Sequence, residues 1–183
     1  MAYVVAVSGI SGSGKTSVIR RAIDLLGDAV ALYFDDYAAA STYPRDLKGW
    51  IERGANVDEW RTPALADAVR RLRGDASGVV LVEEPFGKLR REMASLIDLA
   101  VYLEAPGDVL LTRRLLREIE EQRDVDQLIE RLRLDLTRHL DLGRELDALG
   151  ASALRDSADV VVDATKSVDE VAAEVVAEIR RRR

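Results

Sequence analysis

Residues 9–16 read Gly-Ile-Ser-Gly-Ser-Gly-Lys-Thr and match the pattern G-x-x-x-x-G-K-[ST] at every fixed position. Glycines permit a turn in which successive backbone N–H groups point at a chain of phosphates, and a helix that follows adds the positive end of its dipole. Lys15 can reach the β- and γ-phosphates of a nucleotide, and the Thr16 hydroxyl can ligate Mg²⁺. The sequence therefore predicts an ATP-binding segment made of Gly9, Ser11, Gly12, Ser13, Gly14, Lys15, Thr16 and Ser17.

The residues on either side supply the structural context that this motif requires. An apolar run over 3–7 predicts a strand buried on both faces. Apolar residues at helical spacing between Val18 and Leu26 predict a helix that ends at Gly27. A glycine-rich turn that merely joins a strand to a helix is the alternative, and the complete motif in this context favours phosphate binding.

Strands and helices are predicted to alternate along the rest of the chain. Further strands are expected at 29–34, 79–82, 99–103 and 160–162. Helices are expected over 62–73 and 88–96, from about 106 onward, and over 125–142 and 168–179, whereas 38–61 is expected to be irregular. This order predicts one α/β domain over 1–183, a three-layer P-loop NTPase fold with a five-stranded, mostly parallel sheet.

Composition excludes several classes of protein. The 183 residues contain no cysteine and one histidine, His139, which excludes disulfides, thiolate metal sites and multi-histidine metal sites. The net charge of −6 argues against a general nucleic-acid binder, and the terminal arginines at 180–183 complement a helix dipole. No apolar run approaches the roughly 18 residues of a membrane span, and the N-terminus lacks a basic leader. We expect a cytoplasmic protein without nucleic-acid or membrane partners.

Two pairs of acidic residues follow predicted strands. Asp35-Asp36 comes after the second strand and Glu83-Glu84 after the third. The carboxyl ends of parallel strands meet at one edge of a sheet, where ligands bind. Phosphoryl transfer needs a carboxylate at the acceptor hydroxyl and acidic groups near Mg²⁺. Asp35 is therefore the predicted base, and Glu83, with Thr16 and Asp35, is a predicted metal residue; a solvated turn is the alternative for such pairs.

A cluster of arginines predicts a mobile lid over about 113–124. Its members are Arg113, Arg114, Arg117 and Arg123. Guanidinium groups that close over a transferring phosphoryl group neutralise its charge and exclude water. We expect Arg114 and Arg117 to do so, and surface pairing with the glutamates at 118, 120 and 121 is the alternative.

The sequence motifs that identify other classes of phosphate-loop protein are absent from this chain. No lysine stands in the Asn-Lys-x-Asp pattern that reads guanine in GTPases, and the L-S-G-G-Q signature of transporter ATPases is absent. The chain is also too short for the accessory regions of helicases. A small-molecule kinase fits best.

At these residues the chain resembles the uridine kinase and nicotinamide riboside kinase group of the uridine kinase/phosphoribulokinase family. Asp35-Asp36-Tyr37 is similar to the family's Asp-Asp-Phe, whose first Asp acts on the acceptor hydroxyl. Asn56-Val57-Asp58 with Pro63-Ala64 resembles a segment whose Asp holds ribose hydroxyls. The resemblance implies a substrate site of Asp36, Tyr37, Asp58 and Trp60, although Trp60 fits equally well as a cover for the edge of the core.

The resemblance has two further marks and one departure. Residues 113–118 are similar to the family's lid sequence Arg-Arg-x-x-Arg-Asp, and Glu83 matches a Glu-Gly at the end of the third strand. Here Glu84-Pro85 replaces that glycine. Residues 125–157 match no motif.

These observations together imply an ATP- and Mg²⁺-dependent kinase that phosphorylates a hydroxyl of a nucleoside or similar sugar-containing metabolite. A kinase for a nucleoside monophosphate, another coenzyme precursor or a sugar stays open. So does a non-catalytic nucleotide-binding regulatory domain. The expected partners are ATP and a small-molecule acceptor, and the chain is expected to be a monomer or a homodimer.

Overall fold

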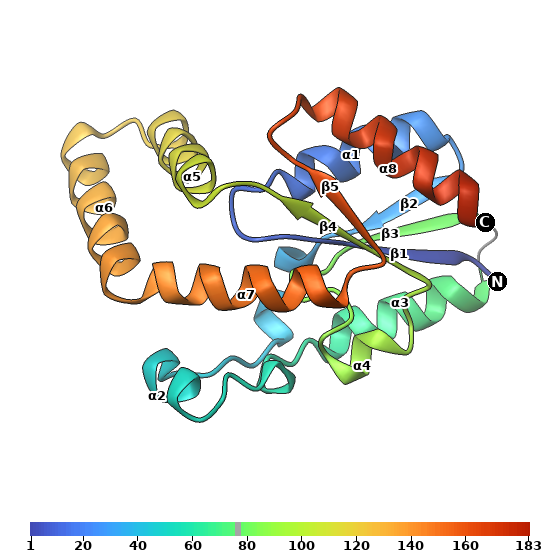
Figure 1. Ribbon diagram of the computed structural model, residues 1–183, viewed down its shortest axis with the longest axis horizontal. Coiled ribbons are helices and arrows are strands. Elements are labelled where there is room, and N and C mark those ends of the chain that lie inside the picture. The colour runs from blue at the N-terminus through green and yellow to red at the C-terminus, as the bar shows by residue number, and fades with distance from the viewer. Residues whose placement is uncertain (76–77) are drawn as a thin grey trace.

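A five-stranded parallel sheet forms the centre of the protein. The computed structural model describes residues 1–75 and 78–183, and in it the strands lie in the order β2-β3-β1-β4-β5 (Figure 1). This confirms the predicted α/β fold. The strands are β1 (Tyr3–Ser8), β2 (Ala29–Leu32), β3 (Val79–Glu83), β4 (Leu99–Glu104) and β5 (Val160–Asp163).

Helices cover both faces of the sheet, and alternate residues of β1 pack into different cores. Val5 and Val7 join the core under α1 (Lys15–Leu26) and α8 (Val168–Arg182). Val4 and Ala6 join the core under α3 (Pro63–Asp75) and the short α4 (Arg91–Ala94). Successive side chains of a strand point to opposite faces, so a strand covered on both sides must be apolar throughout.

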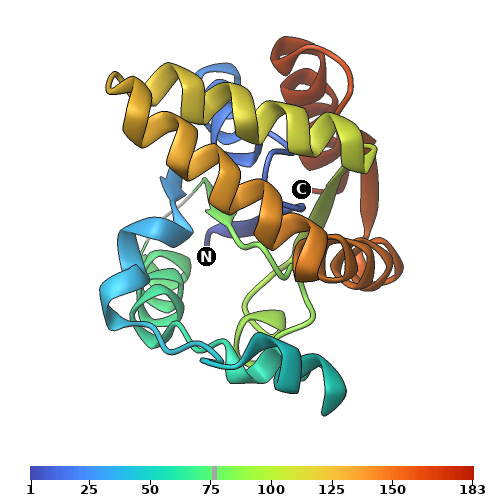
Figure 2. The ribbon, with the colours of Figure 1, turned by 90° about the vertical axis from the view of Figure 1, so that its left-hand side faces the viewer.

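Three helices, called the lid helices from here on, connect β4 to β5, and the segment 113–124 that was predicted to be a lid falls in the first of them and in the residues that follow it (Figures 1 and 2). They are α5 (Gly107–Glu121), α6 (Val125–Arg138) and α7 (Arg144–Ser157). A π-helical turn, η3 (His139–Gly143), joins α6 to α7 and bends the path of the chain. The predicted helix over 125–142 therefore continues to Ser157, and α7 brings Leu154 back into the core at 4% exposed.

The structure corrects three other predicted boundaries. The strand expected to reach residue 34 ends at Leu32, because the 3₁₀ helix η1 (Phe34–Ala40) already begins at Phe34. The helix expected over 88–96 shrinks to α4. The segment expected to be irregular contains α2 (Leu47–Glu52) and the 3₁₀ helix η2 (Val57–Glu59). Asp46 caps α2 by accepting from the Gly49 N–H, and Trp50 anchors that helix at 6% exposed.

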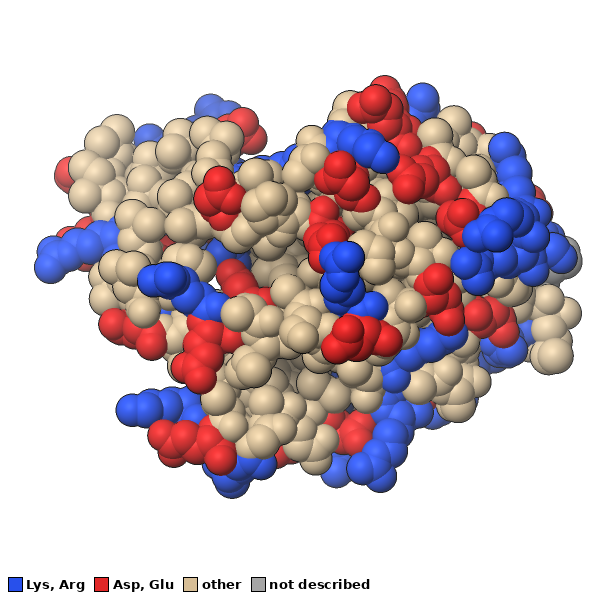
Figure 3. Space-filling model, viewed as in Figure 1, with Lys and Arg blue, Asp and Glu red and all other residues tan. Residues whose placement is uncertain are grey.

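Charged side chains are interspersed over the face in Figure 3, and basic ones gather where α8 ends. Arg180 donates to the Leu25 carbonyl at the end of α1, and Arg183 pairs with Asp28. These contacts tie the end of α8 to the start of β2, as expected for cations at a helix C-terminus. Within the described residues, none of the helices has the length and apolar content needed to cross a membrane.

Candidate functional site

The phosphate loop lies at the carboxyl end of β1, between β3 and β4. Val7 is paired with Glu83 on one side and with Val101 on the other, so the loop leaves the sheet at its centre. Gly12 and Gly14 have φ values of 91° and 89°, in the left-handed region. A Cβ on Gly12 would lie 2.5 Å from the Leu110 carbonyl oxygen, so the loop can pass under α5 only with glycine there.

Two side chains of the loop have the environment expected of a phosphate site. The Ser13 hydroxyl is buried and has no hydrogen-bond partner among the described residues. The Lys15 ammonium donates to the Gly9 carbonyl oxygen at 3.0 Å and to that of Ile10 at 3.5 Å. Both groups are hydrogen-bond donors of the kind that bind phosphate oxygens at the start of a helix.

The pKa of Lys15 is shifted by burial and by the charged groups around it. Burial lowers the pKa of its ammonium. The carboxylates of Glu83 and Asp35 oppose that shift, and the Arg117 guanidinium adds to it. Lys15 therefore lies within electrostatic reach of two carboxylates and one lid arginine.

Thr16 and Glu83 bring two oxygen-bearing side chains together beside the loop. The Thr16 hydroxyl donates to Glu83 Oε2 at 2.8 Å, and Glu83 is 9% exposed. Mg²⁺ prefers such oxygen ligands and keeps several waters or phosphate oxygens in its octahedral shell. In the ranges 1–75 and 78–183, no three His, Cys, Asp or Glu side chains gather into a metal site. This donor set fits Mg²⁺ bound jointly with phosphates.

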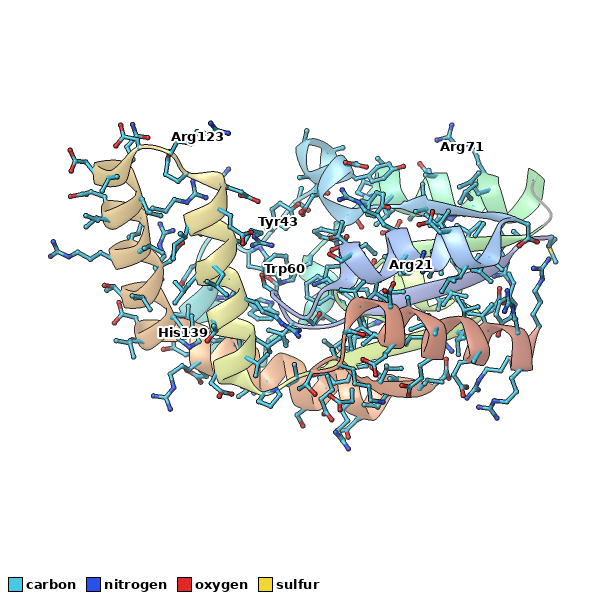
Figure 4. The ribbon with its side chains drawn as sticks, turned by 90° about the horizontal axis from the view of Figure 1, so that it is seen from above. Arg21, Tyr43, Trp60, Arg71, Arg123 and His139 are labelled. Carbon is cyan, nitrogen blue, oxygen red and sulfur yellow. The ribbon has the colours of Figure 1, made fainter. Side chains whose placement is uncertain are left out.

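A cavity of about 760 Å³ brings most of the predicted residues together. It is called the phosphate cavity, after the phosphate loop that lines it. It opens between the lid and the body, and Figure 4 shows Trp60 in this gap. The predicted residues that line it are Gly9, Ser11, Gly12, Ser13, Gly14, Lys15, Thr16, Ser17, Asp35, Trp60, Glu83 and Arg117.

Three predicted substrate residues do not line this cavity. Asp36 is exposed one position further along η1, and Tyr37 packs against the core. Asp58 accepts from the Arg91 N–H at 2.9 Å and pairs with the Arg91 guanidinium at 2.8 Å. It lines a neighbouring cavity of about 490 Å³, to which Trp60 also contributes.

Contrary to expectation, Arg114 does not line the phosphate cavity either. Its guanidinium pairs with Asp147 of α7 at 3.0 Å and lies 3.5 Å from His139, an arrangement that joins the lid helices. Arg113 lines the cavity instead and donates to the Ala164 carbonyl oxygen at 2.8 Å. Arg113 is spaced i, i+4 from Arg117 and Arg114 is spaced i, i+3, so both pairs share a helix face and spacing alone does not select between them.

Further cavity residues escaped the sequence analysis because they carry no motif. Phe34 and Phe86 join the predicted Trp60 in an aromatic wall. The opposite end is lined by Arg20 and by residues after β5, namely Ala164, Lys166, Val168 and Val171.

No known family model matches the sequence. Curated relatives share low identity over most of the chain. The chain is 26% identical to a protein named uridine kinase from Borreliella burgdorferi strain ZS7, over 75% of this chain and 78% of that protein. It is 21% identical to a uridine kinase of Chlamydia pneumoniae, over 87% and 80% of the two chains.

Solved structures of P-loop kinases share the fold at lower identity. Shikimate kinase from Acinetobacter baumannii superposes with a TM-score of 0.55 at 17% identity and covers 99% of this chain and 94% of its own. A sugar kinase from Janibacter superposes with a TM-score of 0.57 at 14% identity and covers 98% and 95%. These similarities establish the P-loop kinase fold.

We predict that Lys15→Met separates nucleotide binding from stability. Affinity for ATP should fall by about tenfold or more, roughly 1.4 kcal/mol, because the variant lacks the cation for the outer phosphates. The free variant should be at least as stable as the wild type, because a buried charge is removed. Calorimetric titration and urea unfolding measure the two effects.

The stability difference between the wild type and Lys15→Met should also change with pH in a defined direction. The pKa of Lys15 is lower in the folded protein than its ordinary 10.5, so the unfolded chain binds more protons in that interval. The wild type should therefore gain stability relative to Lys15→Met as the pH rises toward 10.5. Lys48→Met, at an exposed lysine of α2, is the control and should show no such trend. A pH-independent difference for Lys15→Met would contradict the account.

Proposed function

We propose that this protein is an ATP- and Mg²⁺-dependent kinase that phosphorylates a hydroxyl of a nucleoside or similar sugar-containing metabolite. The carrying observation is that Asp35, the phosphate loop and Arg117 line one cavity. A carboxylate for the acceptor hydroxyl, donors for a triphosphate and a cation for the transferring group are thus combined in one space.

In this proposal the loop amides, Ser13 and Lys15 hold the β- and γ-phosphates at the start of α1. Thr16 and Glu83 hold Mg²⁺, which when bound neutralises charge on the phosphate oxygens. The nucleoside of ATP extends toward the segment after β5, which also lines the cavity. Adenine needs only backbone and apolar contacts there.

Asp35 orients the acceptor hydroxyl and takes its proton. The acceptor oxygen forms a bond to the γ-phosphorus as the bond from that phosphorus to the β–γ bridging oxygen breaks, and ADP leaves. Arg113 and Arg117 lie on the lid helix above this point, where they offset the charge on the equatorial oxygens. We assign the second lid role to Arg113 in place of Arg114, because Arg114 is paired with Asp147.

The acceptor class rests on similarity. The relatives named uridine kinase support a nucleoside, and the neighbours named shikimate kinase and sugar kinase keep other acceptors open. A non-catalytic nucleotide-binding domain was suggested by the Glu84-Pro85 departure. The argument for a non-catalytic domain is weaker in the structure, because Glu84 binds Arg90 and Glu83 keeps its contact with Thr16.

We predict that Asp35→Asn lowers the turnover of acceptor phosphorylation by about 10²- to 10⁴-fold, because the variant cannot accept the proton. ATP affinity should stay close to that of the wild type. ADP formation is measured with a panel of nucleosides and sugars, and mass spectrometry identifies the phosphorylated product. Asp36→Asn, one residue along the same 3₁₀ helix and outside the cavity, is the control and should retain activity. Wild-type ADP release that no acceptor stimulates would favour the non-catalytic alternative.

A second prediction compares two arginines of α5. Arg117→Gln should lower the turnover number by about 10²- to 10³-fold without changing stability, since Arg117 faces the cavity. Arg114→Gln should lower the free energy of unfolding by about 1–3 kcal/mol through its contact with Asp147, with a smaller effect on turnover. Urea unfolding and steady-state kinetics test both, and the reverse pattern would show that Arg114 is the catalytic cation.

A further inference from the structure

A buried arginine joins separate segments of the wall that faces the acceptor. Arg90 and Glu84 are 2% and 0% exposed and form a bidentate ion pair. Arg90 Nε donates to Glu84 Oε1 at 3.1 Å, and Nη2 donates to Oε2. Nη1 donates to the Trp60 carbonyl oxygen at 2.7 Å and to the Thr62 hydroxyl at 2.8 Å. One guanidinium therefore ties the end of β3 to residues 60–62.

Aromatic rings enclose the same guanidinium. Its central carbon lies 5.8 Å from the ring centroid of Phe34 and 5.4 Å from that of Phe86, within the range of cation–π attraction. Phe34 directly precedes Asp35, so a third segment is joined to the pair. Phe34, Phe86 and Trp60 all line the phosphate cavity with Asp35.

Trp60 depends on this arrangement for its position. The Trp50 indole nitrogen donates to the Asn56 carbonyl oxygen, but that of Trp60 is buried and has no partner within the described ranges. The Trp60 ring is instead held by ring contacts, at 5.2 Å from Tyr43 and 5.4 Å from Phe86, and by the bond from Arg90 to its backbone. Removing Arg90 therefore removes one of the contacts that hold Trp60, the largest side chain of the wall.

Burying this ion pair costs free energy of folding, which indicates that its geometry has a role other than stability. Burial raises the pKa of the Glu84 carboxyl, and the Arg90 guanidinium opposes that rise. Apolar side chains of similar volume would avoid the desolvation of two charges. They could not donate hydrogen bonds to a carboxylate and a backbone oxygen, and the ammonium of a lysine lacks the planar fork that binds a carboxylate through two parallel bonds.

We propose that Arg90, oriented by Glu84, is a positioning residue for the phosphoryl acceptor. The inference rests on the proposed kinase function. Arg90 fixes Trp60, Phe34 and Phe86 as a rigid surface beside Asp35, and it does so independently of nucleotide binding. The independence follows from strand alternation: Glu83 faces Thr16 in the phosphate loop, whereas its neighbour Glu84 faces Arg90.

The test uses the double variant Glu84→Met/Arg90→Met, which removes both charges and leaves no unpaired ion in the core. With the acceptor found for the wild type, kcat/KM for that acceptor should fall about 10- to 100-fold. The Kd for ATP should stay within about threefold of the wild type, because the hydrogen bonds of Arg90 go to Glu84, Trp60 and Thr62 and not to the phosphate loop. Arg90→Lys keeps the charge without the planar fork and should show the same selective defect.

A second bidentate ion pair, less buried than the first, provides the control. Arg73 forms a bidentate pair with Asp98 at 2.8 and 2.9 Å, and Asp98 stands before β4, at the edge of the sheet opposite the cavity. Arg73→Met/Asp98→Met should lower stability and leave the acceptor kcat/KM unchanged. An acceptor defect as large in this control would reduce the role of Arg90 to general stability.

A readout that needs no activity separates this inference from the proposed function. Acrylamide quenching of tryptophan fluorescence should increase in Glu84→Met/Arg90→Met and not in the control, because Trp60 becomes mobile. Unchanged quenching, unchanged acceptor kinetics or a parallel loss of ATP affinity would each overturn the inference. A wild type that phosphorylates no acceptor defeats the proposed function, and the quenching result still decides whether Arg90 holds the wall.

Discussion

The structure depends on one constraint: a turn of left-handed glycines must leave the central strand and pass under the lid helix. Gly12 has no room for a Cβ because the Leu110 carbonyl oxygen lies beside it. The turn directs backbone N–H groups, the Ser13 hydroxyl and Lys15 toward the same space at the start of α1. A phosphate chain is the ligand that we propose for this set of donors, and the other proposed roles are assigned relative to it.

The parallel sheet then decides which acids reach that space. Because β3 lies between β1 and β2, the ends of β2 and β3 bring Asp35 and Glu83 to the same edge as the loop. Burying Lys15 there disfavours its charged form, a cost that a protein selected for stability alone would avoid. The strained turn and the buried charges are thus confined to the site, while the two apolar cores hold the sheet.

Local patterns made the sheet and the loop predictable, and long-range packing made other features unpredictable. The phosphate motif, the strands and the acids after them are each contained in a few consecutive residues. The choice between Arg113 and Arg114 depends on how α5 is rotated, and that rotation is set by contacts with Gly12 and Asp147, which lie elsewhere in the chain. Arg90 gave no signal, because its partners Trp60 and Thr62 lie 30 and 28 positions away.

The central claim is that residues 9–16 hold the phosphates of a magnesium-bound triphosphate beside Asp35. Isothermal titration of the wild type with a non-hydrolysable ATP analogue, with and without Mg²⁺, measures this most directly. The account predicts saturable binding of one analogue per chain that strengthens when Mg²⁺ is added. Absence of binding for both adenine and guanine triphosphate analogues, or affinity that Mg²⁺ leaves unchanged, would contradict it.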